Sequence, residues 1–147
     1  MTNTIIPSIE RDSFKVLNPW ESFESFSLSV KEIYSLSEIP KQNELLKNLN
    51  KDLSIKNEKM LQQAEIIVAV LDGADVDSGV AAELGYACAL GKKIIGYRSD
   101  FRVSGDNSAA IVNVQIEYFI NKSGGKIVRD VGELSEALNE LRTDRSA

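Results

Sequence analysis

The stretch AEIIVAVLDGADVDSGVAAELGYACALGKKIIGY, residues 64–97, decides the fold, because it reads as strand, loop, helix and strand in succession. EIIVAVL (65–71) and KKIIGY (92–97) are continuous apolar runs, typical of strands that are buried on both faces. The small and apolar run 78–90 predicts a helix between them, with a glycine next as its stop signal. Two such strands joined by a helix predict a parallel sheet.

The flanking sequence extends this pattern over the whole chain. Apolar residues at spacings of three and four predict helices over 43–64 and, at the end of the chain, 131–142; residues 108–120 predict another helix, and KIV (126–128) a short strand. FKVLNPW (14–20) predicts a strand that ends at a proline, and the serine-rich residues 22–42 predict a long loop with at most a short helix. Alternating strands and helices predict one α/β domain over residues 1–147, a parallel sheet with helices on both faces.

The composition fits a small globular protein and excludes several functions. The 147 residues are 43% hydrophobic and 27% charged, which is ordinary for a globular domain. The net charge of −5 disfavours nucleic-acid binding through phosphates, and the absence of histidine excludes His-based catalysis and His metal sites. No apolar run reaches membrane-spanning length and no signal peptide is recognisable. With a single cysteine, the expected location is the cytoplasm.

An acidic loop follows the first of the two strands, where sheets of this class bind ligands. Asp72, Asp75 and Asp77 lie between strand and helix, and Glu83 lies on the helix among glycines and alanines. Ligands bind at the carboxyl ends of such strands, so these acids are candidates for the site. Ordinary explanations stay open: Asp77 or the next serine can cap the helix, Asp72 can form a turn, and Glu83 can be a solvated acid. Four carboxylates without a basic residue among them favour a bound sugar or cation, although no familiar calcium-loop spacing is present.

Asn57 is a polar residue on the apolar stripe of the helix over 43–64. An amide on the core-facing side is either bonded to backbone or part of a site, and both readings stay open at this point.

Residues 64–102 resemble the nucleoside 2-deoxyribosyltransferase family. The resemblance rests on an acidic loop followed by D-x-G-x-x-x-E-x-G-x-A, which here reads Asp77, Gly79, Glu83, Gly85 and Ala87. It extends less strongly over residues 14–141. It implies a flavodoxin-like fold and a homo-oligomer, a homodimer or larger.

The resemblance also implies an activity, the transfer of a 2-deoxyribosyl group between nucleobases in nucleotide salvage, with no cofactor and no metal. Glu83 is then the nucleophile that forms a covalent glycosyl-enzyme, and Asp77 holds sugar hydroxyls. Asp72 and Gly79 are the expected substrate-binding residues beside them, and Asn113 is expected to reach into the site of a neighbouring subunit. The expected partners are nucleosides, nucleobases and further copies of the chain, with no nucleic acid and no membrane.

The chain departs from the family pattern in two places. The family usually has aspartate at the position of Asn57. Asparagine keeps the hydrogen bonding of aspartate but cannot titrate. Asn57 stays in the expected catalytic set. Family members also have a strand and a helix before the strand that ends in proline, whereas this chain reaches FKVLNPW almost at once. The first strand is therefore expected to be missing or displaced, unless NTII (3–6) fills part of the gap.

Two alternative functions remain. One is hydrolysis of deoxynucleosides or their 5′-monophosphates. The acidic loop repels a phosphate unless Arg98 and Arg102 point into the site, and exposed arginines are commoner. The other is a non-catalytic nucleoside-binding relative, which the short amino-terminal part and Asn57 favour.

Overall fold

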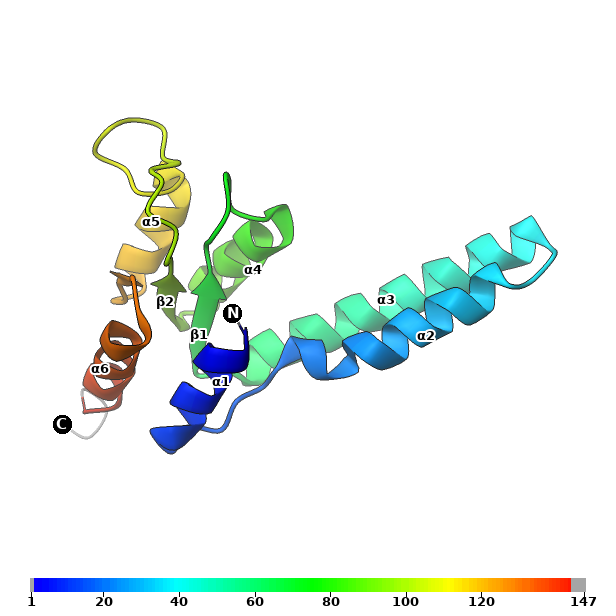
Figure 1. The fold of residues 1–147 in the computed structure, drawn as a ribbon, viewed down its shortest axis with the longest axis horizontal. Helices are drawn as coiled ribbons and strands as arrows, with labels where there is room; N and C mark the ends of the chain where they lie inside the picture. The colour runs from blue at the N-terminus through cyan, green and yellow to red at the C-terminus, as the bar shows by residue number, and fades with distance from the viewer. Residues whose placement is uncertain (1, 144–147) are drawn as a thin grey trace. The chain divides into compact units, whose positions relative to one another are not determined.

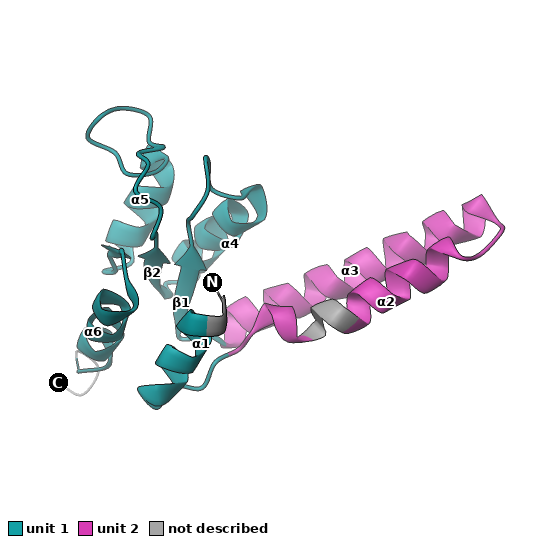
Figure 2. Cartoon of the chain, viewed as in Figure 1, with its two compact units in different colours: residues 1–16, 64–147 teal, residues 17–63 magenta. Residues whose placement is uncertain are grey.

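The computed structural model describes residues 2–143, and these form two compact units (Figures 1 and 2). Unit 1 consists of the residues up to Val16 and those from Ala64 onward, and unit 2 of residues Leu17–Gln63. None of the helices in the described part of the chain has both the length and the apolar character needed to cross a membrane.

A three-stranded parallel sheet lies at the centre of unit 1. Its strands β1 (Ile66–Val70), β2 (Lys93–Tyr97) and β3 (Ile127–Val128) pair in the order β1-β2-β3. In the register of the sheet, Val68 lies opposite Ile95 and Gly96 opposite Ile127. Helix α4 (Ser78–Ala89) joins β1 to β2, and α5 (Val114–Lys122) lies between β2 and β3. This is the predicted α/β architecture with a parallel sheet.

Helices cover both faces of this sheet, as predicted. Helices α4 and α5 bury one face through an apolar cluster that includes Ala69, Leu84, Ile94, Ile116 and Ile120. On the other face, α1 (Thr2–Arg11) and α6 (Val131–Thr143) contribute Ile5, Ile9, Leu134 and Leu138 to a second cluster with Ile95 and Tyr97. Because side chains alternate between the faces along each strand, two covered faces require the unbroken apolar runs seen in the sequence.

Contacts between α1 and α6 close the second face. The Ser135 hydroxyl donates to the Asp12 carboxylate, and Arg142 donates to the Asp12 carbonyl at 3.2 Å. The Arg142 guanidinium also lies 5.4 Å from the centre of the Phe14 ring, a cation–π contact. Segments far apart in the sequence therefore hold this layer together.

The segment before β1 does not form the predicted strand. FKVLNPW forms no strand: Phe14 and Val16 pack against the core from an irregular segment, and the short helix η1 (Pro19–Ser22) follows. Within residues 2–143 no strand precedes β1, and NTII lies in α1. In a flavodoxin-like order the second strand pairs with the first, so without the first strand the segment has no ladder to join.

Unit 2 is a pair of helices, α2 (Phe23–Tyr34) and α3 (Ile39–Gln63), that lie side by side (Figure 2). Helix α3 contains most of the predicted helix 43–64, but α2 replaces the predicted loop. Its partly buried residues include Phe26, Val30 and Ile33, at helical spacing, and the intervening serines hide this pattern in the sequence.

Helix α5 begins later than predicted, at Val114 instead of residue 108. The Glu117 carboxylate accepts hydrogen bonds from the backbone N–H groups of Ile111 and Val112, the latter at 3.0 Å. These bonds hold the preceding residues in a loop, and Asn113 caps the helix. A side chain inside the helix thus competes with helical hydrogen bonding before it.

Candidate active site

The candidate site lies where β1 and β2 end, in unit 1. The backbone continues the sheet for one residue beyond each strand: Leu71 N–H donates to Tyr97 O, and Arg98 N–H donates to Val128 O, both at 2.8 Å. The loop after β1 (72–77) and the loop after β2 (98–102) start from these anchored residues. This is the edge at which parallel α/β sheets bind ligands.

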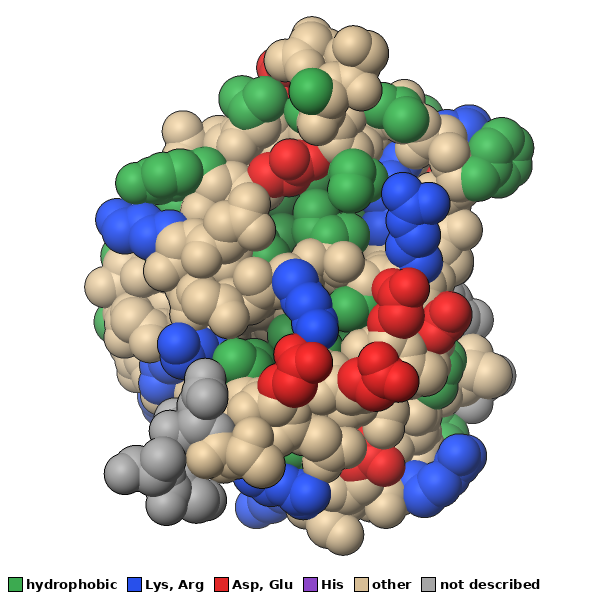
Figure 3. All heavy atoms as spheres, turned by 90° about the vertical axis from the view of Figure 1, so that its left-hand side faces the viewer, with side chains coloured by type: hydrophobic (Ala, Val, Ile, Leu, Met, Phe, Trp, Pro, Cys, Tyr) green, Lys and Arg blue, Asp and Glu red, His purple; other side chains and the backbone are tan. Residues whose placement is uncertain are grey.

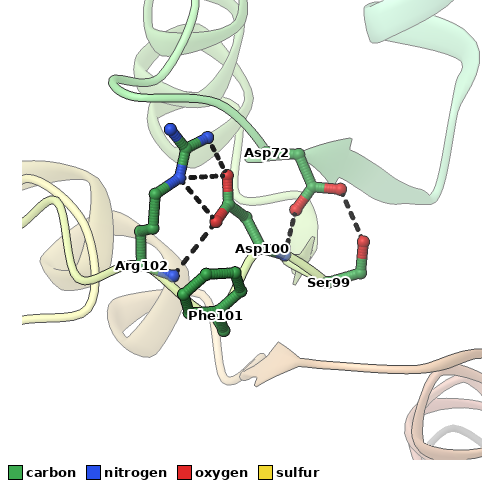
Figure 4. Close-up of a pocket in the computed structure, with 5 residues that line it drawn as sticks. All are labelled: Asp72, Ser99, Asp100, Phe101 and Arg102. Atoms are coloured by element: carbon green, nitrogen blue, oxygen red, sulfur yellow. Dashed lines mark hydrogen bonds and ion pairs between the residues drawn. The ribbon is translucent and has the colours of Figure 1, made fainter.

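Asp72 links the two loops (Figure 4). Its carboxylate oxygens accept a hydrogen bond from the Ser99 hydroxyl and one from the Asp100 backbone N–H, each at 2.8 Å. The predicted substrate-binding residue therefore has a structural role in this arrangement. Each carboxylate oxygen can still accept a further bond from a ligand.

An open hollow of about 550 Å³ lies beside this link, lined by Asp72, Ser99, Asp100, Phe101 and Arg102. The Arg102 Nε donates to Asp100 Oδ1 at 2.9 Å and the Arg102 backbone N–H at 3.0 Å. These hydrogen bonds hold the pKa of the Asp100 carboxyl well below its ordinary value and raise the pKa of Arg102. Phe101 is 92% exposed at the rim. The positive charge of Arg102 is therefore balanced by the Asp100 carboxylate.

Arg98 is buried beneath the loops, only 2% exposed. Its guanidinium donates to the carbonyl of Leu71, to Gly73 O at 3.2 Å and to Arg102 O at 2.7 Å. The acidic loop thus has a cation under it, although the sequence places no basic residue among its acids. Arg98 belongs to the two loops that carry the site, and the expectation of an exposed arginine is wrong for it.

Asp77 caps helix α4. Its Oδ1 accepts from Gly79 N at 2.8 Å and from Val80 N at 3.2 Å. A Cβ on Gly79 would lie 2.9 Å from this oxygen, so glycine leaves the space that the carboxylate occupies. The capping reading of Asp77 is therefore confirmed, and a side chain at Gly79 would displace the capping oxygen.

Glu83 lies one and a half turns further along α4 and is partly buried. Burial of the carboxyl, and next the negative charge of Asp77, raise the pKa of Glu83 above its ordinary value. The two acids are thus close enough to interact, and Glu83 is not the freely solvated acid of the ordinary reading. A carboxylate that is partly desolvated and near a like charge is a typical active-site group.

The other predicted residues lie elsewhere. Asn113 accepts a hydrogen bond from Gln115 N at 3.0 Å as the cap of α5. Asn57 lies on α3 in unit 2, and its buried side-chain oxygen has no hydrogen-bond partner within residues 2–143, so of the two open readings the backbone bond is absent for this oxygen. The hollow is lined by Asp72 but not by Gly79, Asp77 or Glu83. In the described residues no group of acids or cysteines is arranged to hold a metal ion.

The sequence reading missed Asp100 as a member of this site, and it considered an inward-pointing Arg98 only as the less common case. An i, i+2 pair such as Asp100 and Arg102 is a weak signal for a local ion pair. For Arg98 there is no local signal, because its partners are carbonyls more than twenty positions away. Arginine after a buried strand is ordinarily exposed.

On the face of the molecule in Figure 3, acidic and basic side chains are interspersed, and an acidic group gathers on one side. That face has no continuous basic surface for nucleic-acid phosphates.

Comparisons with known proteins agree with this fold. A solved structure of a conserved protein from Enterococcus faecalis V583 is similar, with 23% sequence identity and a TM-score of 0.52. The similarity covers 61% of this chain and 65% of that chain, so this chain spans slightly less than two thirds of it. A search of curated proteins found no match. The sequence profile described as nucleoside 2-deoxyribosyltransferase matches residues 1–127, well over half of the chain. Together with the parallel sheet and the capped helix α4, this match shows that the chain belongs to the nucleoside 2-deoxyribosyltransferase family.

Proposed function

We propose that the protein transfers a 2-deoxyribosyl group from one nucleobase to another through a covalent intermediate on Glu83. In the first step a Glu83 oxygen bonds to the anomeric carbon, and the bond from that carbon to the base nitrogen breaks. The electron pair leaves with the base, which takes up a proton from water. In the second step a nitrogen of the incoming base attacks the same carbon, the bond to the Glu83 oxygen breaks and the carboxylate is released, and the proton of the attacking base passes to water. Two displacements restore the original configuration.

The observation that carries this proposal is the pairing of Glu83 with Asp77 at the start of α4. A partly buried carboxylate with a raised pKa stabilises positive charge on the sugar more strongly than a solvated one does. Asp77 accepts both backbone hydrogen bonds of the cap through Oδ1, so its other carboxylate oxygen takes no part in the cap. This arrangement supports a role for Asp77 in holding a sugar hydroxyl. Gly79, next to it, leaves room for a sugar to approach.

Asp72 and Asn57 complete the proposed site. Asp72 borders the hollow and keeps acceptor capacity for a substrate hydroxyl. Asn57 is proposed to act near the departing base as a hydrogen-bonding group, since it cannot titrate. The family match runs from residue 1 to residue 127 and so spans both compact units, which supports treating the chain as one functional domain.

We also propose a homodimer or larger assembly in which α5 lies at the interface. Val114 and Tyr118 on this helix are 47% and 55% exposed, while Ile116 and Ile120 are buried in the core. Apolar surface beyond what the core uses is typical of an interface. In this assembly Asn113, at the start of α5, lies near Glu83 of the partner subunit.

Hydrolysis of deoxynucleoside monophosphates is the less favoured alternative. The two arginines that could receive a phosphate are already engaged, Arg98 by backbone carbonyls and Arg102 by Asp100. A phosphate that approached the hollow would also meet Asp72. These contacts favour nucleosides, which carry no charge at the 5′ position.

One assay separates the candidate functions. The protein is incubated with adenine and, in parallel reactions, with deoxyinosine or its 5′-monophosphate, and the products are followed by chromatography. Transfer gives deoxyadenosine and hypoxanthine, hydrolysis gives free deoxyribose or its 5′-phosphate and hypoxanthine, and a binding protein gives no product. Mass spectrometry of acid-quenched protein should detect a deoxyribosyl adduct on the peptide with Glu83, and Glu83→Gln should lack it. Hypoxanthine release without deoxyadenosine would contradict transfer.

A further inference from the structure

Arg98 is the one charged residue that is almost fully buried in unit 1, among the residues that the structure describes. No carboxylate of the described residues lies within ion-pair distance of it. Its Nε is buried without a hydrogen-bond partner. Three carbonyl dipoles compensate its charge directly, and the Asp100 carboxylate, whose pKa Arg98 helps to lower, does so at longer range.

Those carbonyls belong to both loops of the candidate site. Leu71 and Gly73 lie at the start of the loop between β1 and α4, and Arg102 lies in the loop after β2. A bond also runs the other way, because Asp72 of the first loop accepts from Ser99 and Asp100 of the second. The two loops are thus tied in both directions, by a cation and by a carboxylate.

A buried guanidinium that forms no direct ion pair is costly, and an apolar side chain of similar size often stabilises a core better. Its planar fork, however, can donate to several acceptors at once in fixed directions, which neither lysine nor an apolar side chain can do. The residue is therefore best explained by the arrangement of the carbonyls that it binds.

We propose that Arg98 is a positioning residue for the transfer reaction. Its guanidinium holds the loop from β1 to α4 against the loop after β2. It thereby fixes Asp72 and the amino-terminal end of α4, which carries Asp77 and Glu83. This inference rests on the proposed function, because it states how the nucleophile is held in place.

The test compares Arg98→Lys, which keeps the charge but loses the fork, with Arg98→Gln, which loses both. Arg142→Lys and Arg142→Gln are the matched controls. Arg142 also donates to a backbone carbonyl, that of Asp12, and to Asn139 Oδ1, but it joins α1 to α6 instead of the loops. The full-length variants are measured for kcat and KM and for backbone hydrogen exchange by mass spectrometry.

Displacement of a reacting group by about 1 Å can cost on the order of 100-fold in rate. We expect kcat to fall about 100-fold in both Arg98 variants, with a smaller rise in KM. Exchange should speed up in peptides from residues 71–80 and 98–103 and stay unchanged in β3 and α6. The Arg142 variants should keep the kcat and KM of the parent protein.

Unchanged kcat and unchanged loop exchange in Arg98→Gln would overturn the proposal. So would exchange that rises equally in β3 and α6, because Arg98 would then support the fold as a whole. Failure of the proposed function looks different: the parent protein itself would give no transferred product. In that case the hydrogen exchange alone would still decide whether Arg98 holds the two loops.

Discussion

Replacement of Asp77 can separate its role in the helix from its role in the reaction. The carboxylate caps α4 through two hydrogen bonds, to Gly79 N and Val80 N, and its charge also contributes to the raised pKa of Glu83. Asparagine and serine cap helices well but carry no charge, whereas alanine has neither the capping group nor the charge. A series of Asp77→Asn, Asp77→Ser and Asp77→Ala therefore removes the two properties in different combinations.

The stability of the series should follow the cap. Loss of an N-cap side chain costs about 1 kcal/mol, which in a domain of this size lowers Tm by about 3 °C. We expect this fall in Asp77→Ala and changes of about a third of it or less in Asp77→Asn and Asp77→Ser. Thermal unfolding followed by circular dichroism measures it.

The activity of the series should follow the charge. A hydrogen bond from a sugar hydroxyl to a charged group is worth roughly 1.5–3 kcal/mol, and about 1.4 kcal/mol corresponds to a factor of ten in rate. Asp77→Ala should therefore lower kcat/KM by about 10- to 150-fold, and Asp77→Asn by less, because its amide oxygen still accepts. Initial rates of deoxyadenosine formation measure the loss.

The pH profile provides the sharpest check. Burial is the larger cause of the raised pKa of Glu83, and the negative charge of Asp77 is the second. The reaction needs Glu83 in its ionised form. Without that charge the pKa of Glu83 falls, so the acid limb of kcat/KM should move to lower pH in Asp77→Asn and Asp77→Ser. An acid limb that stays in place in both variants, with kcat/KM like that of the parent protein, would refute the reasoning.

Three further predictions concern other parts of the site. Glu83→Gln should abolish turnover by several orders of magnitude and stay folded. Because the pKa of Glu83 is raised in the folded state, the parent protein loses stability as the pH rises through that pKa. Glu83→Gln should therefore be more stable than the parent protein at pH 7. Urea unfolding measures this gain, which should be absent below about pH 4. Asn57→Asp should raise kcat or leave it unchanged, and a folded variant with lower kcat would contradict the role given to Asn57. Light scattering at micromolar concentration should give a dimer or larger, which Tyr118→Glu weakens; a stable monomer of the parent protein would remove Asn113 from the site.

The parts of the fold that the sequence predicted are those with strong periodicity. The runs in β1 and β2 are unbroken because both faces of the sheet are covered, and α3, α4 and α6 carry apolar residues at helical spacing. The predicted strand over 14–20 was wrong for a non-local reason, since a strand needs a neighbour to pair with. Helix α2 was missed because serines obscure its stripe, and the start of α5 because Glu117 reaches back to the loop.

The residues of the site were likewise predicted where their sequence pattern is local and missed where their contacts are not. The sequence singled out Asp77 and Glu83, since a capping position and an acid among small residues are local patterns. The hydrogen bond from Ser99 to Asp72 and the one from Arg98 to Leu71 each join residues that lie 27 positions apart. Such contacts depend on how β1 and β2 are paired, and no spacing within one segment reveals them.

The packing of α1 on α6 has a consequence for the chain while it is being synthesised. Asp12 and Ser135 are 123 positions apart. At about 5–20 residues per second, the ribosome takes roughly 6 to 25 s to add the intervening residues. During that time Ile5 and Ile9 have no α6 to cover them, although they are almost fully buried in the finished protein. Ile5 and Ile9 therefore stay exposed on the nascent chain until α6 has left the ribosome and can pack against them.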